Sequence, residues 1–278
     1  MTVRLDALSV HPVKSTAGRP LASATVDAWG LAEDRRWMVV TGDGAVLTAR
    51  EEHGLLGIVA DTPATDPCVD APLRLRAAGS EDLLLDAPSG EPGPVTVHGT
   101  PTTGLPVPAA RDWLRAALGR DDVDLVALDR PRPVSDRHGV PGAHTSFTDS
   151  SPVTLASLPS LRRLQDLVTE TALERGEEPT ALSMGRFRPN LVLDGDLEPF
   201  AEDAWSTVEA GGVTLRVVGP VDRCVMTTLD PVTRERGHEP IRTLARHRRW
   251  DGCTWFAVWA VPTVPGEVAV GDEVTVHR

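Results

Sequence analysis

The sequence predicts an α+β protein dominated by strands, with a β-rich N-terminal half followed by a second, barrel-like half. Short apolar runs recur at close spacing, which favours a barrel or a sandwich. Helical periodicity is confined to three segments, and no internal repeat is evident. The 278 residues suffice for one large domain or two ordinary ones, and their 41% hydrophobic and 24% charged content is typical of a globular protein.

The N-terminal half is predicted to consist mainly of short strands. Residues 3–10 are expected to form a strand with a bulge. Residues 36–41 and 45–49 are expected to form a hairpin around Gly42-Asp43-Gly44, since glycine adopts the positive φ of such turns. Apolar runs predict further strands at residues 55–60, 73–77, 83–86 and 95–98.

A proline-rich loop and a helix are predicted at the end of this half. Six prolines between residues 88 and 108 indicate a segment that is mostly loop. A helix is expected at about 107–118, with Gly119 as its stop. We therefore divide the chain into domains at 1–125 and 126–278, and the prediction allows the termini to intertwine between the two.

The second half combines strands with two helices. A Pro/Arg/Gly-rich loop is expected at 130–146, and Ser157 is the predicted N-cap of a helix that runs to about 175 and ends at Gly176. A short basic helix is expected near 240–249. The expected strands are 123–128, 190–194, 213–218, 224–229, 254–261 and 273–277.

Charge and cysteine content exclude several classes of protein. The formal net charge of −12 argues against a nucleic-acid binder, which needs a basic surface against the phosphate backbone. No signal-peptide core and no run of about 18 apolar residues is present, so no membrane span is expected. Three cysteines without a CxxC pair exclude a disulfide scaffold or zinc ribbon, and a reducing, cytoplasmic location is expected.

The use of basic residues is unusual, because Lys14 is the only lysine beside 27 arginines. One interpretation is that a strong arginine bias left this lysine by chance. The other is a site that needs a compact ammonium group rather than a planar guanidinium. The sequence leaves both open.

The chain lacks the nucleotide-loop, nucleophile-elbow and metalloprotease motifs, so the candidate site comes from five polar segments that each follow a predicted strand. Each segment alone is compatible with a turn, a solvated surface or, for Cys224, a buried core thiol. Together they supply cations, hydroxyls and backbone N–H groups suited to a phosphate-bearing ligand. Cys224 is the one soft metal ligand near them, and the adjacent Arg223 favours its thiolate form. The segments are 11–15, 30–37, 147–152, 185–190 and 222–231.

Taken in order, these motifs resemble those of the MOSC proteins, and more closely of those with a MOSC N-terminal β-barrel domain, the group of the mitochondrial amidoxime-reducing component and its bacterial relatives. The resemblance spans nearly the whole chain, so that 1–125 corresponds to the N-terminal β-barrel domain and 126–278 to a MOSC β-barrel domain with peripheral helices. The matching motifs are Pro12-Val13-Lys14-Ser15, Gly30 to Trp37, Leu47-Thr48-Ala49-Arg50-Glu51, Asp149 to Pro152, Phe187-Arg188-Pro189-Asn190, Glu202 to Trp205, Arg223-Cys224, Thr227 to Pro231, Glu239-Pro240 and Val270-Gly271-Asp272.

The resemblance implies a molybdenum enzyme whose metal is held by a pterin dithiolene and by one protein cysteine. Cys224 matches the cysteine that ligates molybdenum, and it is therefore the candidate catalytic and metal-binding residue. Trp255 falls where relatives carry a tyrosine near the cofactor, so the aromatic ring is kept and the hydroxyl is lost. The residues that match cofactor-binding positions are Lys14, Ser15, Arg35, Asp149, Ser150, Ser151, Arg188, Asn190 and Arg223.

The implied activity is reduction of amidoximes, hydroxylamines or N-oxides, with electrons from a separate ferredoxin, flavodoxin or cytochrome. Residues 223–249 hold seven arginines and three acidic residues, and Arg242, Arg246 and Arg249 are spaced to share a helix face. This face is either a docking surface for that donor or an ordinary solvated face. Two alternative functions remain: a carrier or insertion protein for molybdenum cofactor or sulfur, and an anion-binding protein in which Cys224 is merely buried.

Overall fold

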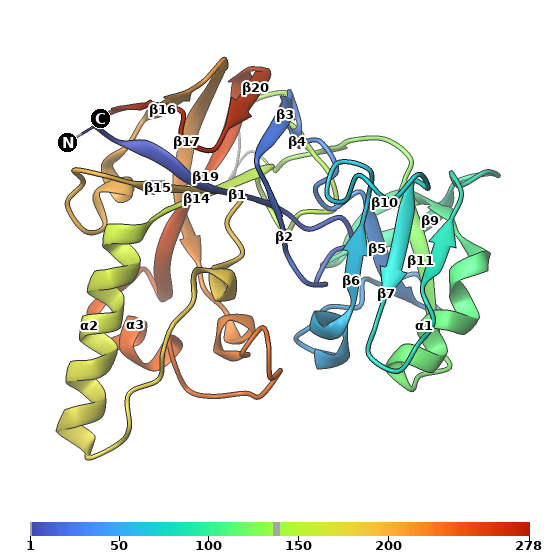
Figure 1. Ribbon diagram of the computed structural model, residues 1–278, viewed down its shortest axis with the longest axis horizontal. Helices are drawn as coiled ribbons and strands as arrows, with labels where there is room; N and C mark the ends of the chain where they lie inside the picture. Colours follow the sequence, from blue (N-terminus) through green and yellow to red (C-terminus); the bar gives the residue numbers. More distant parts are fainter. Residues whose placement is uncertain (1, 136–139) are drawn as a thin grey trace.

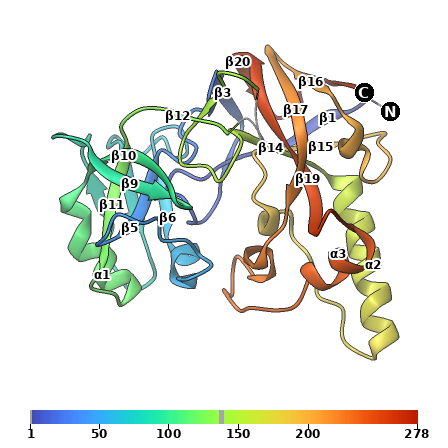
Figure 2. The same cartoon turned by 180° about the vertical axis from the view of Figure 1, so that it is seen from behind.

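The computed structural model describes residues 2–135 and 140–278 and confirms a strand-dominated α+β fold (Figure 1). Two lobes lie side by side. One carries α2 (Leu158–Arg175) and α3 (Ile241–His247), which lie against each other at its outer end, and the other carries α1 (Arg111–Leu118) (Figures 1 and 2). Short 3-10 helices in the described residues are His53–Gly57, Pro108–Ala110, Met184–Phe187, Ala201–Ala204 and Val225–Thr228.

The larger sheet contains strands from both ends of the chain. Its strands, in spatial order, are β2 (Arg19–Leu21), β1 (Arg4–Val10), β15 (Leu191–Asp194), β14 (Val153–Ser157), β19 (Cys253–Val264), β17 (Val213–Asp222), β16 (Thr207–Ala210) and β21 (Val274–His277), and β18 (Arg249–Trp250) pairs with β19. β14 and β15 are parallel, and α2 lies in the connection between them, as a parallel crossover requires. The bulge expected in the first strand lies between Leu5 and Ala7.

Smaller sheets make up most of the other lobe. One contains β5 (Trp37–Thr41), β11 (Val123–Leu128), β10 (Thr100–Pro106) and β9 (Gly93–Val97), in that order. Another contains β6 (Val59–Asp61), β7 (Leu73–Arg76) and β8 (Leu83–Leu85). Two further small sheets are β12 (Arg132–Pro133) with β13 (His144–Thr145), and β20 (Gly266–Ala269) with β3 (Ser23–Asp27) and β4 (Gly30–Leu31), which packs in the core of the lobe with the larger sheet. Residues 136–139 of the loop expected at 130–146 lie outside the described residues.

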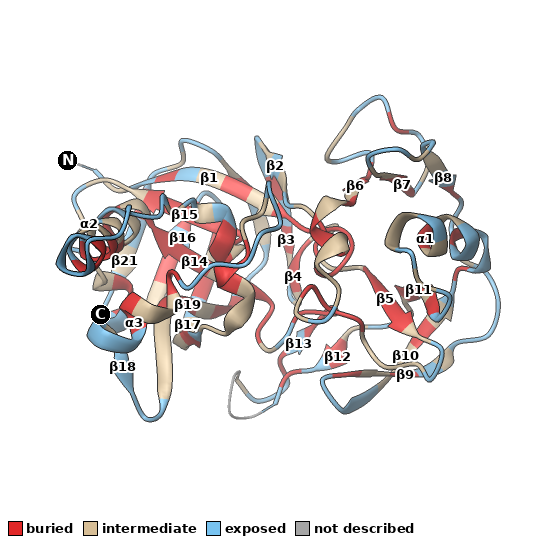
Figure 3. Ribbon diagram, turned by 90° about the horizontal axis from the view of Figure 1, so that it is seen from below, coloured by how far each residue is buried: buried red, intermediate tan, exposed pale blue. Residues whose placement is uncertain are grey.

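The strands at residues 4–10 and 23–31 pack with the second half of the chain. Leu5, Val26 and Leu31 share one hydrophobic core with Val153 and Val258, whereas a separate core gathers residues between Val13 and Ala127 together with Leu229. The buried segments of both lobes are visible in Figure 3. The chain therefore crosses between the lobes near residues 10–37, and this crossing carries several of the candidate site residues.

The helix boundaries follow the expected capping residues. The Ser157 side chain accepts a hydrogen bond from the Ser160 backbone N–H, and Gly176 ends α2 with φ 65°. Gly119 ends α1 in the same left-handed conformation, with φ 64°. These ends confirm the predictions for both helices, and α3 confirms the short basic helix expected near 240–249.

Three predicted segments differ from the structure. The proline-rich segment contains β9, which confirms the strand expected at 95–98, and also β10, which was not expected. Pro94 is tolerated because β9 is an edge strand, where a proline need not donate to a neighbour. Residues 45–49 pair only through single bridges, because Thr48 and Glu51 close a turn there. The segment expected as a strand at 55–60 begins instead as the 3-10 helix His53–Gly57.

The prediction of a strand at 224–229 is also wrong, because this segment forms the 3-10 helix Val225–Thr228. Here the threonine side chains turn back on the backbone. The Thr227 hydroxyl donates to the Cys224 carbonyl over 3.0 Å, and the Thr228 hydroxyl donates to the Val225 carbonyl over 2.7 Å. Such local bonds compete with strand pairing and favour a turn. Cys224 is therefore the residue before a helical turn, not a residue in the middle of a strand.

Gly30 fixes the contact between the segment that carries Arg35 and the segment that follows Asp149. It has φ +114°, and a Cβ atom there would lie 2.9 Å from the Pro152 carbonyl oxygen. We expect Gly30→Ala to lower the free energy of unfolding by about 2–4 kcal/mol, from backbone strain and the clash together. Chemical denaturation measures this loss.

Gly119→Ala is the matched control for Gly30→Ala. Gly119 also has a positive φ, +64°, but no heavy atom within 4 Å of a built Cβ in the described residues. The free energy of unfolding of Gly119→Ala should fall by about 1 kcal/mol, from backbone strain alone. Equal losses in the two variants would contradict the clash at Pro152.

Candidate functional site

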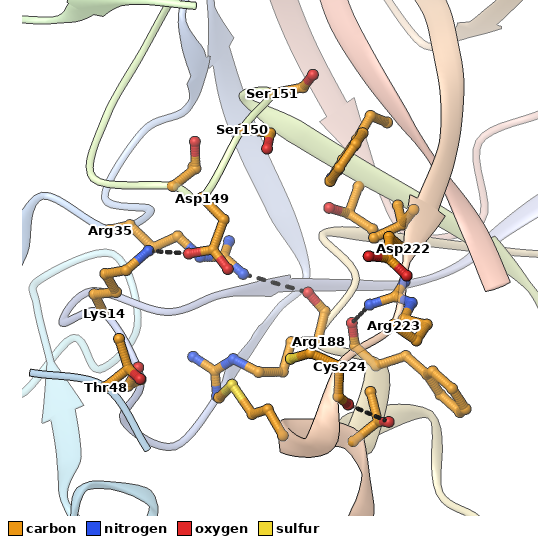
Figure 4. Close-up of a pocket in the computed structure, with 18 of the residues that line it drawn as sticks. Lys14, Arg35, Thr48, Asp149, Ser150, Ser151, Arg188, Asp222, Arg223 and Cys224 are labelled. Carbon is orange, nitrogen blue, oxygen red and sulfur yellow. Dashed lines mark hydrogen bonds and ion pairs between the residues drawn. The ribbon is translucent and has the colours of Figure 1, made fainter. Parts of the chain in front are cut away.

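A pocket between the two lobes brings together most of the residues that the sequence predicted (Figure 4). Its walls come from segments far apart in the chain, around residues 14, 35, 50, 149, 188 and 223. The predicted residues that line it are Lys14, Ser15, Arg35, Asp149, Ser150, Ser151, Arg188, Asn190, Arg223 and Cys224.

Backbone hydrogen bonds hold these segments at the ends of their strands. The Lys14 N–H donates to the Trp37 carbonyl over 2.8 Å, the Arg35 N–H to the His11 carbonyl over 2.8 Å, and the Phe147 N–H to the Arg35 carbonyl over 3.1 Å. Ser15, Arg35 and Arg188 have φ of 69°, 52° and 51°, a left-handed conformation that is uncommon for residues other than glycine. The fold therefore maintains costly backbone conformations where the candidate side chains enter the pocket.

Lys14 is buried and paired with Asp149. Its ammonium group donates to the Phe147 carbonyl over 2.8 Å and forms an ion pair with the Asp149 carboxylate. Burial lowers the pKa of Lys14 to about 8, against the attraction of Asp149. Burial would raise the pKa of Asp149, but Lys14, His98 and Arg50 outweigh it and hold that pKa well below its ordinary value.

Two half-buried arginines of the pocket have hydrogen-bonding capacity to spare. Arg188 donates to the Thr16 carbonyl over 2.6 Å, and Arg223 donates to the Phe256 and Phe187 carbonyls over 2.7 and 3.0 Å. In each, the Nη2 atom is buried and has no partner among the described residues. Burial, followed for Arg188 by the charge of Arg35, lowers the pKa of both guanidinium groups to about 9. A cation with a buried N–H group that has no partner suits a bound anion.

Cys224 is half-buried, and its sulfur lies beside an arginine that sequence reasoning did not select as a site residue. The Arg50 Nε–H donates to the Cys224 Sγ over 3.2 Å, and Arg50 Nη2 donates to Asp149 Oδ2 over 3.0 Å. His98 Nε2 lies 3.0 Å from Asp149 Oδ1. Arg50 belongs to the segment 47–51, whose match to the family motif was the signal that marked it.

The remaining predicted residues have different positions. The Asn190 side-chain amide accepts a hydrogen bond from the Thr154 N–H and donates one to the Ser9 carbonyl. It therefore connects β14 to β1 at the pocket wall. Trp255 is not among the lining residues within the described parts of the chain. Its indole donates to the Trp250 carbonyl over 3.0 Å, and Trp259 lines the pocket instead. Ala257, which lies between these tryptophans, has φ 67°, which interrupts the regular alternation of β19.

Sequence reasoning missed further residues of the pocket wall. Arg186 lines it as well, and this buried side chain forms an ion pair with Asp230 over 2.7 Å. Arg186 lies in the candidate segment 185–190, but it precedes the family motif Phe187–Asn190 and was not selected as a cofactor-binding residue. The other lining residues outside the predicted set include Thr48, Asp222, Met226 and Thr227.

The basic helix face differs from the prediction. Arg242 pairs with Glu239 and Glu177 over 2.6 and 2.8 Å, and Arg246 pairs with Glu174. Arg249 lies in β18 and not in the helix. Glu174 and Glu177, which a count over 223–249 leaves out, therefore offset two of the counted positive charges.

Among the helices that the structure describes, none has the length and the hydrophobicity needed to span a bilayer.

His11, behind the pocket, predicts acid sensitivity. Burial, then the charges of Arg188 and Arg35, lower its pKa from 6.5 to about 3. The unfolded chain therefore takes up this proton below pH 6.5 while the folded protein does not, so stability falls as the pH decreases through that window. We expect the free energy of unfolding to drop by about 2–3 kcal/mol between pH 6.5 and 4.5, and to drop less in His11→Gln. Denaturation at several pH values checks this, and equal slopes would contradict it.

Comparison with known proteins adds two family matches. The MOSC N-terminal beta barrel domain matches residues 2–121, and the MOSC domain matches residues 142–275.

Individual relatives agree with these matches. Mitochondrial amidoxime-reducing component 1 of Homo sapiens is 31% identical, with 96% of this chain and 81% of that protein aligned. Mitochondrial amidoxime reducing component 2 of Bos taurus is 28% identical, over 96% of this chain and 81% of its own length. Molybdenum cofactor sulfurase of Solanum lycopersicum is 27% identical over 91% of this chain, but this alignment covers only 32% of that protein.

Proposed function

Because this chain belongs to the MOSC family and carries the MOSC N-terminal β-barrel domain, we propose that it is a molybdenum-cofactor-dependent oxidoreductase that reduces N-hydroxylated compounds. One observation of the structure carries this proposal. The Cys224 thiol, which is a soft metal ligand, lines the same pocket as Arg188 and Arg223, whose buried Nη2 atoms have donors to spare. A ligand that combines a thiolate-binding metal with an anionic group would satisfy both.

The residues of the pocket fit a molybdenum cofactor with a phosphate group. Cys224 would supply the protein ligand to the metal. Lys14, Arg35 and Arg188 would neutralise the phosphate, and the hydroxyls of Ser15, Ser150 and Ser151 would donate further hydrogen bonds. When bound, the cofactor supplies a metal that accepts oxygen and stores electrons.

The protein's own contribution is to orient the reactants and to exclude water. In the proposed reaction the N–O bond of the substrate breaks, two electrons and two protons are taken up, and the products are the N–H compound and water. The buried Lys14 ammonium and the buried Nη2 atom of Arg188 would hold the anionic end of the ligand away from solvent. Charge interactions are stronger there than in bulk water. We propose that the electrons come from a separate donor of the ferredoxin, flavodoxin or cytochrome type.

The test is to produce the protein in a host that makes the cofactor. We expect close to one molybdenum and one pterin per chain. We also expect a reduced artificial donor to be oxidised only when an amidoxime or a hydroxylamine is added. Protein that holds no molybdenum would overturn the proposal. Loaded protein that reduces no such compound, yet passes its cofactor or sulfur to an apo-enzyme, would establish the carrier function instead.

A further inference from the structure

Arg50 connects the candidate metal ligand to the ion pair of Lys14 and Asp149. Its side chain is about one-quarter exposed, and its Nε and Nη2 atoms form one edge of the planar guanidinium. That edge spans two acceptors: the Cys224 Sγ at 3.2 Å and the Asp149 Oδ2 at 3.0 Å. Arg50 comes from the N-terminal half of the chain, whereas Cys224 and Asp149 come from the second half.

A compact turn fixes the position from which Arg50 reaches the pocket. Thr48 and Ala49, which precede it, are buried, and the Thr48 N–H donates to the Glu51 carboxylate over 3.1 Å. The Arg50 N–H donates in turn to the Thr48 hydroxyl over 3.2 Å. The backbone of Arg50 is therefore held on both sides, and its side chain does not have to be ordered by a ligand.

The electrostatic surroundings keep Arg50 charged. Partial burial opposes the charge, but the attraction of Asp149 and Cys224 outweighs it, so the pKa of Arg50 lies above its ordinary value. Asp149 is itself shared with Lys14 and His98. The Cys224 sulfur is thereby linked through Arg50 and Asp149 to the ammonium group of Lys14.

We propose that Arg50 is a positioning residue that sets the direction and the electron density of the Cys224 sulfur through its N–H···S bond, while its second nitrogen fixes Asp149. This inference rests on the proposed function, because the sulfur has a reaction to serve only as a metal ligand. Hydrogen bonds to a ligating sulfur withdraw electron density from it and help to set the reduction potential of the metal. Loss of the bond would therefore lower the potential.

The competing explanation is that Arg50 only forms an ion pair with Asp149 and has no effect on the sulfur. The choice of substitution separates these two explanations. Arg50→Met removes both bonds. Arg50→Lys keeps the charge beside Asp149, but it loses the planar edge that reaches both acceptors. Arg19→Met is a matched control, since Arg19 has 24% exposure against 26% for Arg50 and pairs with Asp61 over 2.7 Å outside the pocket.

The experiment compares these variants as molybdenum-loaded protein by electron paramagnetic resonance at controlled potentials. For Arg50→Met we expect molybdenum content within twofold of the parent, an altered Mo(V) spectrum and a lower midpoint potential. We also expect an at least tenfold lower kcat with KM within twofold. Arg50→Lys should regain the parental thermal stability but not the parental spectrum, and Arg19→Met should keep the parental spectrum and potential.

The outcomes distinguish this inference from the function on which it rests. Loaded Arg50→Met with the parental spectrum and potential would overturn the role of Arg50 alone. Full recovery of both by Arg50→Lys would show that charge, and not the N–H···S geometry, is what matters, and would also overturn it. A parent protein without molybdenum would overturn the proposed function and this inference with it.

Discussion

Replacing Cys224 with serine is expected to lower turnover of an amidoxime or a hydroxylamine by at least about 1,000-fold while the fold stays intact. The reason is that a hydroxyl is a poor substitute for the soft thiolate that holds molybdenum. Cys224 is half-buried and precedes a 3-10 turn. Its carbonyl group, and not its sulfur, accepts the hydrogen bond from Thr227 in that turn. The free energy of unfolding should therefore change by no more than about 1 kcal/mol. Steady-state turnover with an artificial donor and chemical denaturation measure the two effects.

Cys68→Ser is the control for this experiment. Cys68 is exposed and does not line the pocket as far as the structure describes the chain, so the substitution should leave turnover at the parental level. If Cys224→Ser retained parental turnover, thiolate ligation at this position would be wrong. If both variants lost turnover equally, the effect would come from general damage and not from the metal ligand.

Replacing Lys14 with methionine is expected to lower cofactor occupancy about 10- to 100-fold. Each hydrogen bond to a charged group contributes about 1.5–3 kcal/mol, and the Lys14 ammonium is buried at the wall where the phosphate is proposed to bind. The remaining pocket cations keep Asp149 paired, because Arg50 lies 3.0 Å from that carboxylate. Pterin and molybdenum content of the purified protein measure occupancy.

Two variants give the Lys14 result its meaning. Arg162→Met removes an exposed cation that pairs with Asp194, and it should leave occupancy unchanged. Lys14→Arg tests the shape of the cation, because a planar guanidinium does not fit the space of a compact ammonium bonded to Phe147 and Asp149. Occupancy in Lys14→Met equal to that in Arg162→Met would contradict a role for this lysine in binding the cofactor.

The sequence located most of the candidate pocket because its residues follow strands. Lys14 and Arg188 come directly after strand or turn segments, and such loops meet at the rim where strands end. Trp255 was misplaced for a local reason. A regular strand would direct Trp255 and Trp259 to the same face, but the left-handed conformation of Ala257 separates them. No sequence pattern indicated a left-handed alanine in the middle of a strand.

The residues that sequence reasoning missed depend on contacts distant in the chain. Arg50 lies 174 positions from Cys224, and no periodicity links the two. The charge of the expected basic face was misjudged for the same reason, whereas its role in docking a donor stays a prediction. Arg242 and Arg246 form a basic patch when counted along the chain, yet Glu177 and Glu174 of another segment lie against them. Charge along the chain does not give charge on a surface when ion pairs form between elements.

By itself the sequence determined the strand-rich class, the capped ends of α1 and α2, and the segments that carry cations, hydroxyls and the thiol. These features follow from local patterns: periodicity, capping residues and turn chemistry. Tertiary structure alone decided that the strands at residues 4–10 and 23–31 pack with the second half and that Arg50 reaches Cys224. It also left Arg188 and Arg223 each with a buried nitrogen that has no partner, judged over the described residues. Burial and pairing are properties of the packed chain, since each depends on neighbours that lie far away in sequence.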